Sequence, residues 1–378
     1  MIIYNVKTFN EDNILKALEK KINENIKLAK LQEYYNGLME IDKRYYSDPT
    51  KPNNKIKANY CKDITDFLTA YLVGVPVKIE NISNEVKQIL INNEEDSELQ
   101  QLVTDMNING FGAELFYFNE NGDIKFNNIN PLECVVFMND DLQEDIIGFL
   151  RVIKNDIDVG GWTCTLYTNE TYRTLNINES LSSVVFGEEK QHHFTQVPIV
   201  LYRNNEQMQG CFEQIIPMQD ALNKIISDTV NDYEGFVDAY LCLEGMQGTS
   251  TEDIEQMKNN RVLLLDSDSK AYWLTKTVNN EHIKTLQDDL RATILELGNV
   301  PDLKDIKGMN ISGEAMKMRL TKTEIQASRQ ERVVYKGLIN KLKFLSYADN
   351  LITNGEFKEP IITFTRNFIM GDKEDKES

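Results

Sequence analysis

The chain has 378 residues, and its 60 acidic and 41 basic side chains give a formal net charge of −19 at pH 7. A hydrophobic fraction of 41%, with 9% aromatic residues, supplies enough apolar surface for packed cores and excludes an intrinsically disordered chain. The acidic balance argues against tight, sequence-independent binding of nucleic acid by the whole surface, although it leaves a local basic patch open.

The sequence lacks the signals of a secreted protein and of a membrane-spanning protein. The N-terminus has neither the basic nor the long apolar region of a signal peptide, and no apolar run approaches the roughly 18 residues of a membrane span. We therefore expect no membrane association. The cysteines are odd in number and form no CxxC pair, so we expect reduced thiols at Cys61, Cys134, Cys164, Cys211 and Cys242.

The first 80 residues predict two helices separated by a break. Apolar residues recur at helical spacing over 11–35, and Gly37 suits the position just after the helix end. Two prolines within 47–54 prevent helix there. A buried stripe beginning at Tyr60 predicts a second helix, which a Gly-Val-Pro sequence ends before a short strand at 77–79.

Residues 75–205 are expected to form an α+β body with a mostly antiparallel sheet. A capping box at Ser97–Gln100 predicts a helix that ends near Gly110. From Phe111 the hydrophobic period changes to two, and Asn121-Gly122 is a strong hairpin signal between strands at 111–118 and 124–129. Further strands are expected at 133–138, 146–153, 162–168, 172–176 and 197–202.

The second half of the chain predicts long helices around a small insertion. Residues 211–240 are expected to form one helix of about 45 Å, longer than a compact globule needs. A small αβ insertion over 241–279 follows, and helix returns at 280–297. After a loop that includes Pro301, another long helix is expected over about 314–350.

The charge changes sign between these helices. The helix at 211–240 carries Glu213, Asp220, Asp228, Asp232, Glu234 and Asp238 against a lone Lys224. Residues 299–343 instead hold ten basic and five acidic side chains, and Lys304 and Lys307 lie in the loop itself. This order suits a protein that lets a polyanion pass without holding it. The alternative is a pair of ordinary solvated helix faces.

The sequence contains no motif for catalysis. There is no P-loop, no GxGxxG after a strand, no GxSxG and no HExxH, so we expect no enzyme and no cofactor. A zinc site that joins His192 or His193 to Cys211 is disfavoured, because adjacent residues of a strand point to opposite faces. The acidic residues at 140–145 suit a surface loop better than a divalent cation site, so no metal is expected.

An ordered series of short motifs runs through the chain. These are YYNG at 34–37, DPTKPNN at 48–54, NY at 59–60, YLVGVPV at 71–77, NGFGA at 109–113, DTVND at 228–232, FVDA at 236–239, SGEAMK at 312–317 and FTRN at 364–367. Together they resemble the portal proteins of tailed bacteriophages, in the subfamily typical of phages of Gram-positive bacteria. The resemblance covers about residues 30–370.

The resemblance implies a ring-forming α+β portal fold with a defined division of the chain. The implied parts are an α/β wing at 1–205, a first stem helix at 206–240, a small αβ clip at 241–279, a second stem helix at 280–298 and a tunnel loop at 299–313. Residues 314–378 would hold the long helix, the return to the wing and a crown. The family usually continues into a helical crown, whereas this chain ends at Ser378, so the crown is expected to be short or truncated.

The resemblance also implies a function and a set of partners. Such proteins form a homo-oligomeric ring, usually of twelve subunits, at one capsid vertex of the virion, and the ring assembles in the host cytoplasm. Double-stranded DNA passes through its channel without being read, and the terminase large subunit and the head-tail adaptor dock on it. The major capsid and scaffolding proteins are further implied partners. Portals are not motors, which agrees with the missing P-loop.

These implications assign roles to particular residues. An acidic stem helix with Asp220, Asp228, Asp232 and Asp238 would line the channel and repel phosphates. Lys304 and Lys307 would form a basic collar that touches the DNA backbone, unless they pair with nearby aspartates or face solvent. The alternatives are another structural connector or tail component without terminase docking, and a phage enzyme whose site the sequence does not reveal.

Overall fold

The chain divides into two units. The first comprises residues 1–38, 59–217 and 293–378, and the second comprises residues 39–58 and 218–292. The computed structural model describes residues 2–4, 6, 8–49, 51–139, 145–235, 240–244, 250, 252, 255, 270–274, 280–302, 318–353 and 359–367.

The first unit begins with helix α1 (Glu11–Tyr35), as the apolar spacing predicts. Asn10 caps its N-terminus by accepting a hydrogen bond from the Asn13 amide at 3.0 Å. Gly37 ends the helix with φ of 79°, which lets the Leu38 amide donate to the Glu33 carbonyl at 2.8 Å. The predicted role of Gly37 is confirmed.

Three more helices and a two-stranded sheet follow the predicted break. Helix α2 (Tyr60–Val73) and strand β2 (Lys78–Glu80) match the prediction, and β2 pairs antiparallel with β13 (Ile361–Thr363). Helix α3 (Asn84–Asn92) was not predicted. The capping box at Ser97 is wrong, because α4 (Glu95–Asn109) begins two residues earlier. Glu94, at φ 52°, makes the tight turn from α3 into α4.

The predicted antiparallel strands form two sheets rather than one. In the first, β3 (Phe111–Phe118) lies between β10 (Ile199–Arg203) and β4 (Ile124–Asn128), and the hairpin at Asn121-Gly122 is confirmed. The second is a six-stranded sheet in which β1 pairs parallel with β5 and all other pairs are antiparallel. Its order is β1 (Ile2–Tyr4), β5 (Cys134–Met138), β6 (Ile146–Lys154), β7 (Trp162–Tyr167), β8 (Thr171–Ile177) and β9 (Val184–Gln191).

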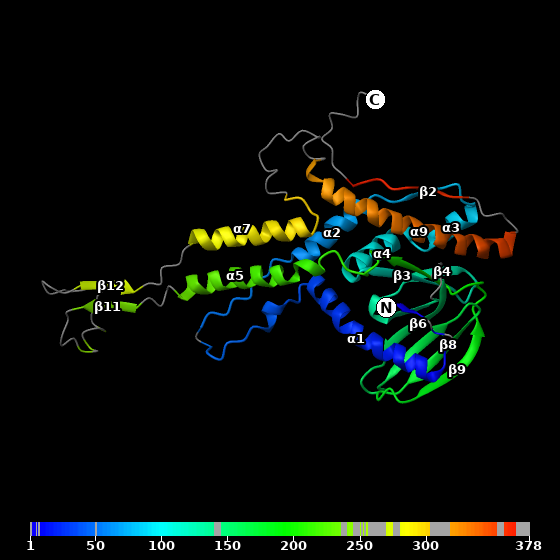
Figure 1. Ribbon diagram of the computed structural model, residues 1–378, viewed down its shortest axis with the longest axis horizontal. Coiled ribbons are helices and arrows are strands. Elements are labelled where there is room, and N and C mark those ends of the chain that lie inside the picture. Colours follow the sequence, from blue (N-terminus) through cyan, green and yellow to red (C-terminus); the bar gives the residue numbers. More distant parts are fainter. Residues whose placement is uncertain are drawn as a thin grey trace, which may run out of the picture. The chain divides into compact units, whose positions relative to one another are not determined.

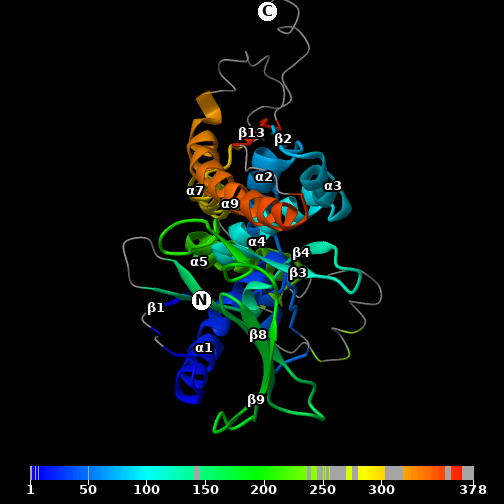
Figure 2. The ribbon, with the colours of Figure 1, turned by 90° about the vertical axis from the view of Figure 1, so that its right-hand side faces the viewer.

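Each sheet has its own helical cover and its own core. Helix α1 packs Ile14 and Leu18 onto the six-stranded sheet, where Val135, Leu150 and Cys164 are fully buried (Figure 2). The second core joins α2, α4, β3, β4, β10 and the long helix α9 (Thr321–Thr353), which was predicted over about 314–350. The two short 3₁₀ segments η1 (Glu40–Lys43) and η2 (Pro131–Glu133) complete the described N-terminal half.

A glycine sets how closely α9 approaches β10. A Cβ on Gly337 would lie 1.9 Å from the ring of Tyr202, which is fully buried and cannot move aside. Glycine inside a helix costs about 1 kcal/mol relative to alanine. The close packing of helix and ring therefore explains why this position carries glycine.

The second unit contains the paired helices and a small sheet. Helix α5 (Ile216–Gly235) follows the 3₁₀ turn η3 (Glu213–Ile215), and α7 (Asn280–Leu297) matches its prediction. The two helices run alongside each other in opposite directions (Figure 1). Between them in sequence, β11 (Tyr240–Glu244) pairs antiparallel with β12 (Lys270–Leu274).

One predicted element of this unit is too long. The helix expected over 211–240 extends for only 20 residues in α5, which is about 30 Å. Tyr240 instead pairs with Leu274 in the small sheet. Local helical periodicity continued to Tyr240 in the sequence, but a partner strand more than 30 residues away decides its conformation.

Candidate functional site

A polar ladder holds residues 54–58 along helix α5. The Asn223, Ser227 and Asn231 side chains are spaced by four residues and lie on one helix face. Their oxygens accept hydrogen bonds from the backbone amides of Ala58 (2.9 Å), Ile56 (2.9 Å) and Asn54 (2.8 Å). Residues 54–58 have no regular secondary structure, so these side chains replace the partners a sheet would supply.

The spacing of the ladder follows from two elementary repeats. Four residues of helix advance about 6.0 Å, and two residues of extended chain advance about 6.6 Å. Every second amide of residues 54–58 therefore meets every fourth residue of α5, with the two segments antiparallel. Gln219 adds a further contact to the Ala58 carbonyl and donates to Asn223 at 3.0 Å. Gln219, Asn223 and Ser227 are fully buried.

The predicted acidic residues of α5 lie beside this ladder. Asp228 forms an ion pair with Arg44, whose Nη1 lies 2.6 Å from the carboxylate Oδ1. The same guanidinium donates through Nε to Asn53 at 3.0 Å and contacts the Asn54 carbonyl. The Glu234 carboxylate accepts a hydrogen bond from the side-chain amide of Asn54 at 2.7 Å. Arg44 therefore ties the chain entering the ladder to an acidic helix residue.

Of the other predicted site residues, two are described by the structure and three are not. Asp220 and Asp232 are half-buried on α5. Asp238, Lys304 and Lys307 lie outside the described residues. The pairing of Asp228 with Arg44 was missed. The period-four polar series at Gln219, Asn223, Ser227 and Asn231 was the available sequence signal for a segment docked on this face.

A buried charge cluster fixes α9 in the first unit. Lys341 is fully buried, although the sequence placed it in the basic segment 299–343. Its ammonium lies 2.6 Å from Glu114, contacts Glu95, and sits 3.7 Å from the centre of the Phe126 ring. Tyr202 donates to the second oxygen of Glu114 at 2.7 Å. Lys341 therefore serves the packing of α9 and presents no charge to the solvent.

In this cluster, burial and charge pairing shift the pKa of each ionisable group in opposite directions. Burial raises the pKa of Glu95 to about 7, against the attraction of Lys341. Burial alone would lower the pKa of Lys341, but the Glu114 and Glu95 carboxylates outweigh it and raise that pKa. Among the described residues, neither Glu95 oxygen accepts a well-directed hydrogen bond. The cluster therefore carries one excess buried carboxylate.

A second charge cluster takes up the acidic residues of α9. Arg366 Nη2 lies 2.9 Å from Glu324 and 2.6 Å from Glu331, which are separated by two helical turns. Tyr71 donates to Glu324 at 2.8 Å. Hydrogen bonding from Arg366 lowers the pKa of Glu324 despite partial burial, which raises it. Glu324 and Glu331 thus both face the chain segment that contains the FTRN motif.

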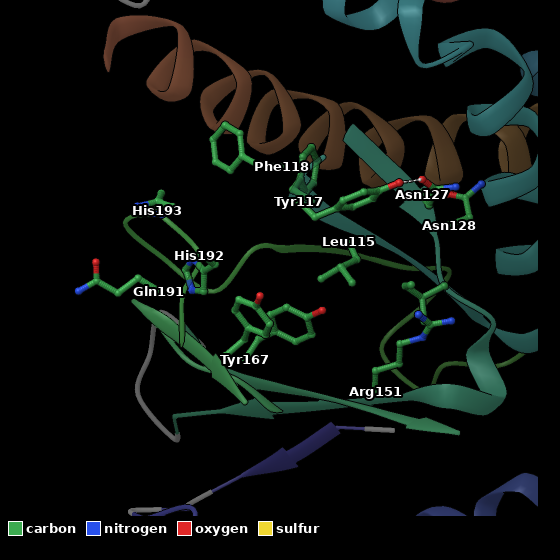
Figure 3. Close-up of a pocket in the computed structure, with 13 residues that line it drawn as sticks. Leu115, Tyr117, Phe118, Asn127, Asn128, Arg151, Tyr167, Gln191, His192 and His193 are labelled. Atoms are coloured by element: carbon green, nitrogen blue, oxygen red, sulfur yellow. Dashed lines mark hydrogen bonds between the residues drawn. The ribbon is translucent and has the colours of Figure 1, made fainter. Parts of the chain in front are cut away.

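A cavity of about 680 Å³ lies between the two sheets of the first unit. Figure 3 shows Tyr167 and Arg151 on the six-stranded sheet, opposite Tyr117 and Phe118 from β3. Tyr117 donates to Asn127 at 3.1 Å, and Arg151 is paired with Glu133 at 2.8 Å. The lining is mainly aromatic and amide in character.

His192, at the edge of this cavity, has both ring nitrogens engaged. Nε2 donates to the Thr168 carbonyl at 3.0 Å, and Nδ1 accepts from the Phe194 amide at 3.1 Å. Burial lowers its pKa, which favours this neutral form. The described part of the chain contains no group of three or more His, Cys, Asp or Glu side chains able to hold a metal. Cys61, Cys134, Cys164 and Cys211 are free thiols.

The comparisons with known proteins define the class. The family model described as "Phage portal protein, SPP1 Gp6-like" matches residues 15–377. The chain therefore belongs to this family of phage portal proteins, as the motif resemblance predicted, and its mixed helix and strand architecture agrees with the predicted α+β class.

Individual relatives share low sequence identity with this chain, but the similarity extends over most of each protein. The chain is 24% identical to the portal protein of Bacillus phage SPP1, over 97% of this chain and 76% of that protein. It is 22% identical to the portal protein of Clostridium phage phiCD119, over 86% of this chain and 77% of that protein. An HK97-family phage portal protein from Corynebacterium diphtheriae matches with a TM-score of 0.39 and 9% identity, over 80% of this chain and 89% of that one.

Within the described ranges, none of the helices combines the length and the apolar character needed to cross a bilayer.

Proposed function

We propose that this chain assembles into a ring at one vertex of the phage capsid. DNA enters through the ring during packaging and leaves through it during ejection, and the terminase large subunit and the head-tail adaptor dock on it in turn. The observation that carries the proposal is the match of the portal family model to residues 15–377. The ring would be a structural channel in the virion, so the chain itself would hydrolyse nothing.

We assign the parts of the portal to the chain as follows. The second unit, with α5, α7 and the β11–β12 sheet, would form the stem and the clip, and the first unit would form the wing and the long helix. The separate clustering of residues 218–292 supports this division. Residues 39–58 belong to the same unit, and the ladder holds 54–58 along α5, so we add this segment to the stem.

The acidic residues of α5 would act as a wall that repels phosphates. A wall that neutralises no phosphates releases no counterions, so DNA gains little affinity for it and slides with low friction.

The ring is tested by negative-stain electron microscopy of the purified chain, alone and co-expressed with the capsid and scaffolding proteins. We expect rings of about twelve subunits with an axial hole, the geometry of a closed heterologous assembly. A compact monomer under both conditions, or an enzymatic activity of such a monomer, would contradict the proposal.

Replacing both Lys304 and Lys307 with alanine is expected to alter DNA packaging or retention while rings still form. The two lysines lie in the proposed tunnel loop, where a basic collar would touch phosphates without reading bases. Packaged DNA length and retention in particles are the measurements. A matched control replaces the exposed Lys16 and Lys20 of α1 with alanine. Unchanged packaging and retention in the loop variant would remove the collar.

A further inference from the structure

The exposed charged side chains along the described part of α9 are all basic. Between Met318 and Ser346 they are Arg319, which lies just before the helix, and Lys322, Arg329, Arg332, Lys336 and Lys343 within it. Successive members are mostly separated by three, four or seven residues, which places them in one stripe along the helix. Tyr335 and Ile325 are also exposed on this helix. We refer to these six residues as the α9 stripe.

The contacts of α9 explain why the α9 stripe contains only positively charged residues. The two acidic residues whose side chains are described on α9, Glu324 and Glu331, are bound by Arg366, and Lys341 is buried with Glu114. Only Lys322 of the stripe has an ion pair within the described residues, with Glu296 at 2.7 Å. Thus Glu324, Glu331 and Lys341 are paired within the protein, whereas the exposed charges of the described part of the helix are basic.

The positive charges in the middle of the α9 stripe are not paired with carboxylates of the described residues. Among the side chains that the structure describes, no carboxylate pairs with Arg329, Arg332 or Lys336. Like charges three or four residues apart destabilise a helix by a few tenths of a kcal/mol per pair. In a chain with 19 more acidic than basic residues, nearby carboxylates would be the ordinary remedy. These three exposed positive charges are therefore available to a molecule that supplies the counter-charge.

The dimensions of the stripe fit duplex DNA. From Lys322 to Lys343 the helix advances about 32 Å, which is close to one turn of B-form DNA, about 34 Å. Duplex DNA presents one phosphate charge per roughly 1.7 Å of its axis, so each side chain has several phosphates within reach. Arginine and lysine supply most phosphate contacts, and an exposed tyrosine such as Tyr335 can add a hydroxyl donor.

We propose that the α9 stripe binds the sugar-phosphate backbone of double-stranded DNA without reading its sequence. The proposal rests on the portal function proposed above and places a DNA contact on a described helix, outside the tunnel loop. A second copy of the chain is the competing occupant. Lysine is depleted at protein–protein interfaces, although arginine and tyrosine are enriched there, so the argument for a polyanion is that all six charges have one sign.

The test compares two variants with equal charge change. The stripe variant is Arg329→Gln with Arg332→Gln and Lys336→Gln. The control replaces Lys16, Lys87 and Lys190 with glutamine, three exposed lysines on other elements of the same unit. Ring formation is scored first by negative stain. Binding of a random-sequence duplex of about 30 base pairs is then measured by fluorescence anisotropy between about 50 and 200 mM salt.

The expected result is specific to the stripe variant. Its rings form, its affinity at about 50 mM salt falls at least about tenfold, and its slope of log K against log salt decreases in magnitude by about 3, nearly one per phosphate contact removed. The control keeps the wild-type slope. A charge-conserving variant, Arg329→Lys with Arg332→Lys, stays within about threefold of wild type, because backbone contacts need charge rather than a fork of donors.

Three outcomes would overturn the proposal, and each is distinct from failure of the portal function. Equal loss in the stripe and control variants would mean that only net charge matters. Rings of the wild type that bind no DNA at low salt would show that the stripe has another role. Loss of rings in the stripe variant alone would assign the stripe to a subunit interface. If the wild type forms no rings, the portal proposal itself fails.

Discussion

Replacing Lys341 with methionine is expected to lower the free energy of unfolding by about 3–5 kcal/mol at neutral pH. Methionine has a similar length and no charge, so the change removes the ammonium while leaving little empty space. It leaves Glu114 and Glu95 buried without their cation. Removing one partner of a buried ion pair costs far more than the pair contributes, because the remaining charge is neither solvated nor paired.

The loss is expected to depend on pH with a definite sign. In the folded wild type the pKa of Glu95 is already raised from 4.5 to about 7 by burial, so folding disfavours the ionised form. Its contribution to stability is therefore greatest below about pH 4.5 and declines as the pH rises toward 7. Without the attraction of Lys341, protonation becomes easier still. The deficit of the variant should be largest near pH 8 and smaller near pH 5.5.

Chemical unfolding at a fixed protomer concentration measures this difference, since assembly would otherwise shift the midpoint. Lys343→Met is the matched control, two residues along the same helix and exposed, and should change stability by less than about 0.5 kcal/mol. Adding Glu95→Gln to Lys341→Met should recover part of the loss. A Lys341→Met deficit that matches the control, or that grows at low pH, would contradict the role of the cluster.

The sequence predicted the elements whose stability comes from long periodic stripes. Helices α1, α2, α7 and α9 and the β3–β4 hairpin lie within a few residues of their predicted positions. Their signals are local, since an apolar face at period 3.6 or a turn dipeptide depends on neighbours along the chain. The family, too, was accessible, because the order and spacing of short motifs survive where overall identity is low.

Elements that depend on strand pairing rather than on an apolar pattern of their own were missed. Strand β9 is mostly exposed and carries a Gly-Glu-Glu-Lys series, so it lacks the alternation expected of a strand and is held by pairing with β8. The short strands β1 and β13 depend in the same way on β5 and β2. Such pairing is invisible to local periodicity.

The candidate site shows the same division. The acidic composition of 211–240 was evident, but the partner of Asp228 is Arg44, which lies 184 residues earlier in the chain. Lys341 looked like one more base of a basic segment and proved to be fully buried. Composition gives the sign of a region. Only the fold decides which charges are satisfied internally and which face outward.

The double replacement Asn223→Ala with Ser227→Ala is expected to release residues 54–58 from α5. The partly buried amides of Ala58 and Ile56 would lose their acceptors, and an unsatisfied group costs up to about 1–3 kcal/mol when it is fully buried. We expect a loss of up to about 2–6 kcal/mol, mainly as local opening of this segment rather than unfolding of the whole chain. Hydrogen exchange of the Ile56 and Ala58 amides reports on it directly.

Both amides should exchange at least about tenfold faster in the variant, since tenfold corresponds to about 1.4 kcal/mol of opening free energy. Lys224→Ala, an exposed change on the same helix, should leave the exchange unchanged. The two rungs share one segment, so the double variant should lose less than the sum of the single variants, because opening at one rung already frees the next. Unaltered exchange at Ile56 and Ala58 would mean that contacts other than the ladder hold this segment, and it would remove our reason for adding residues 39–58 to the stem.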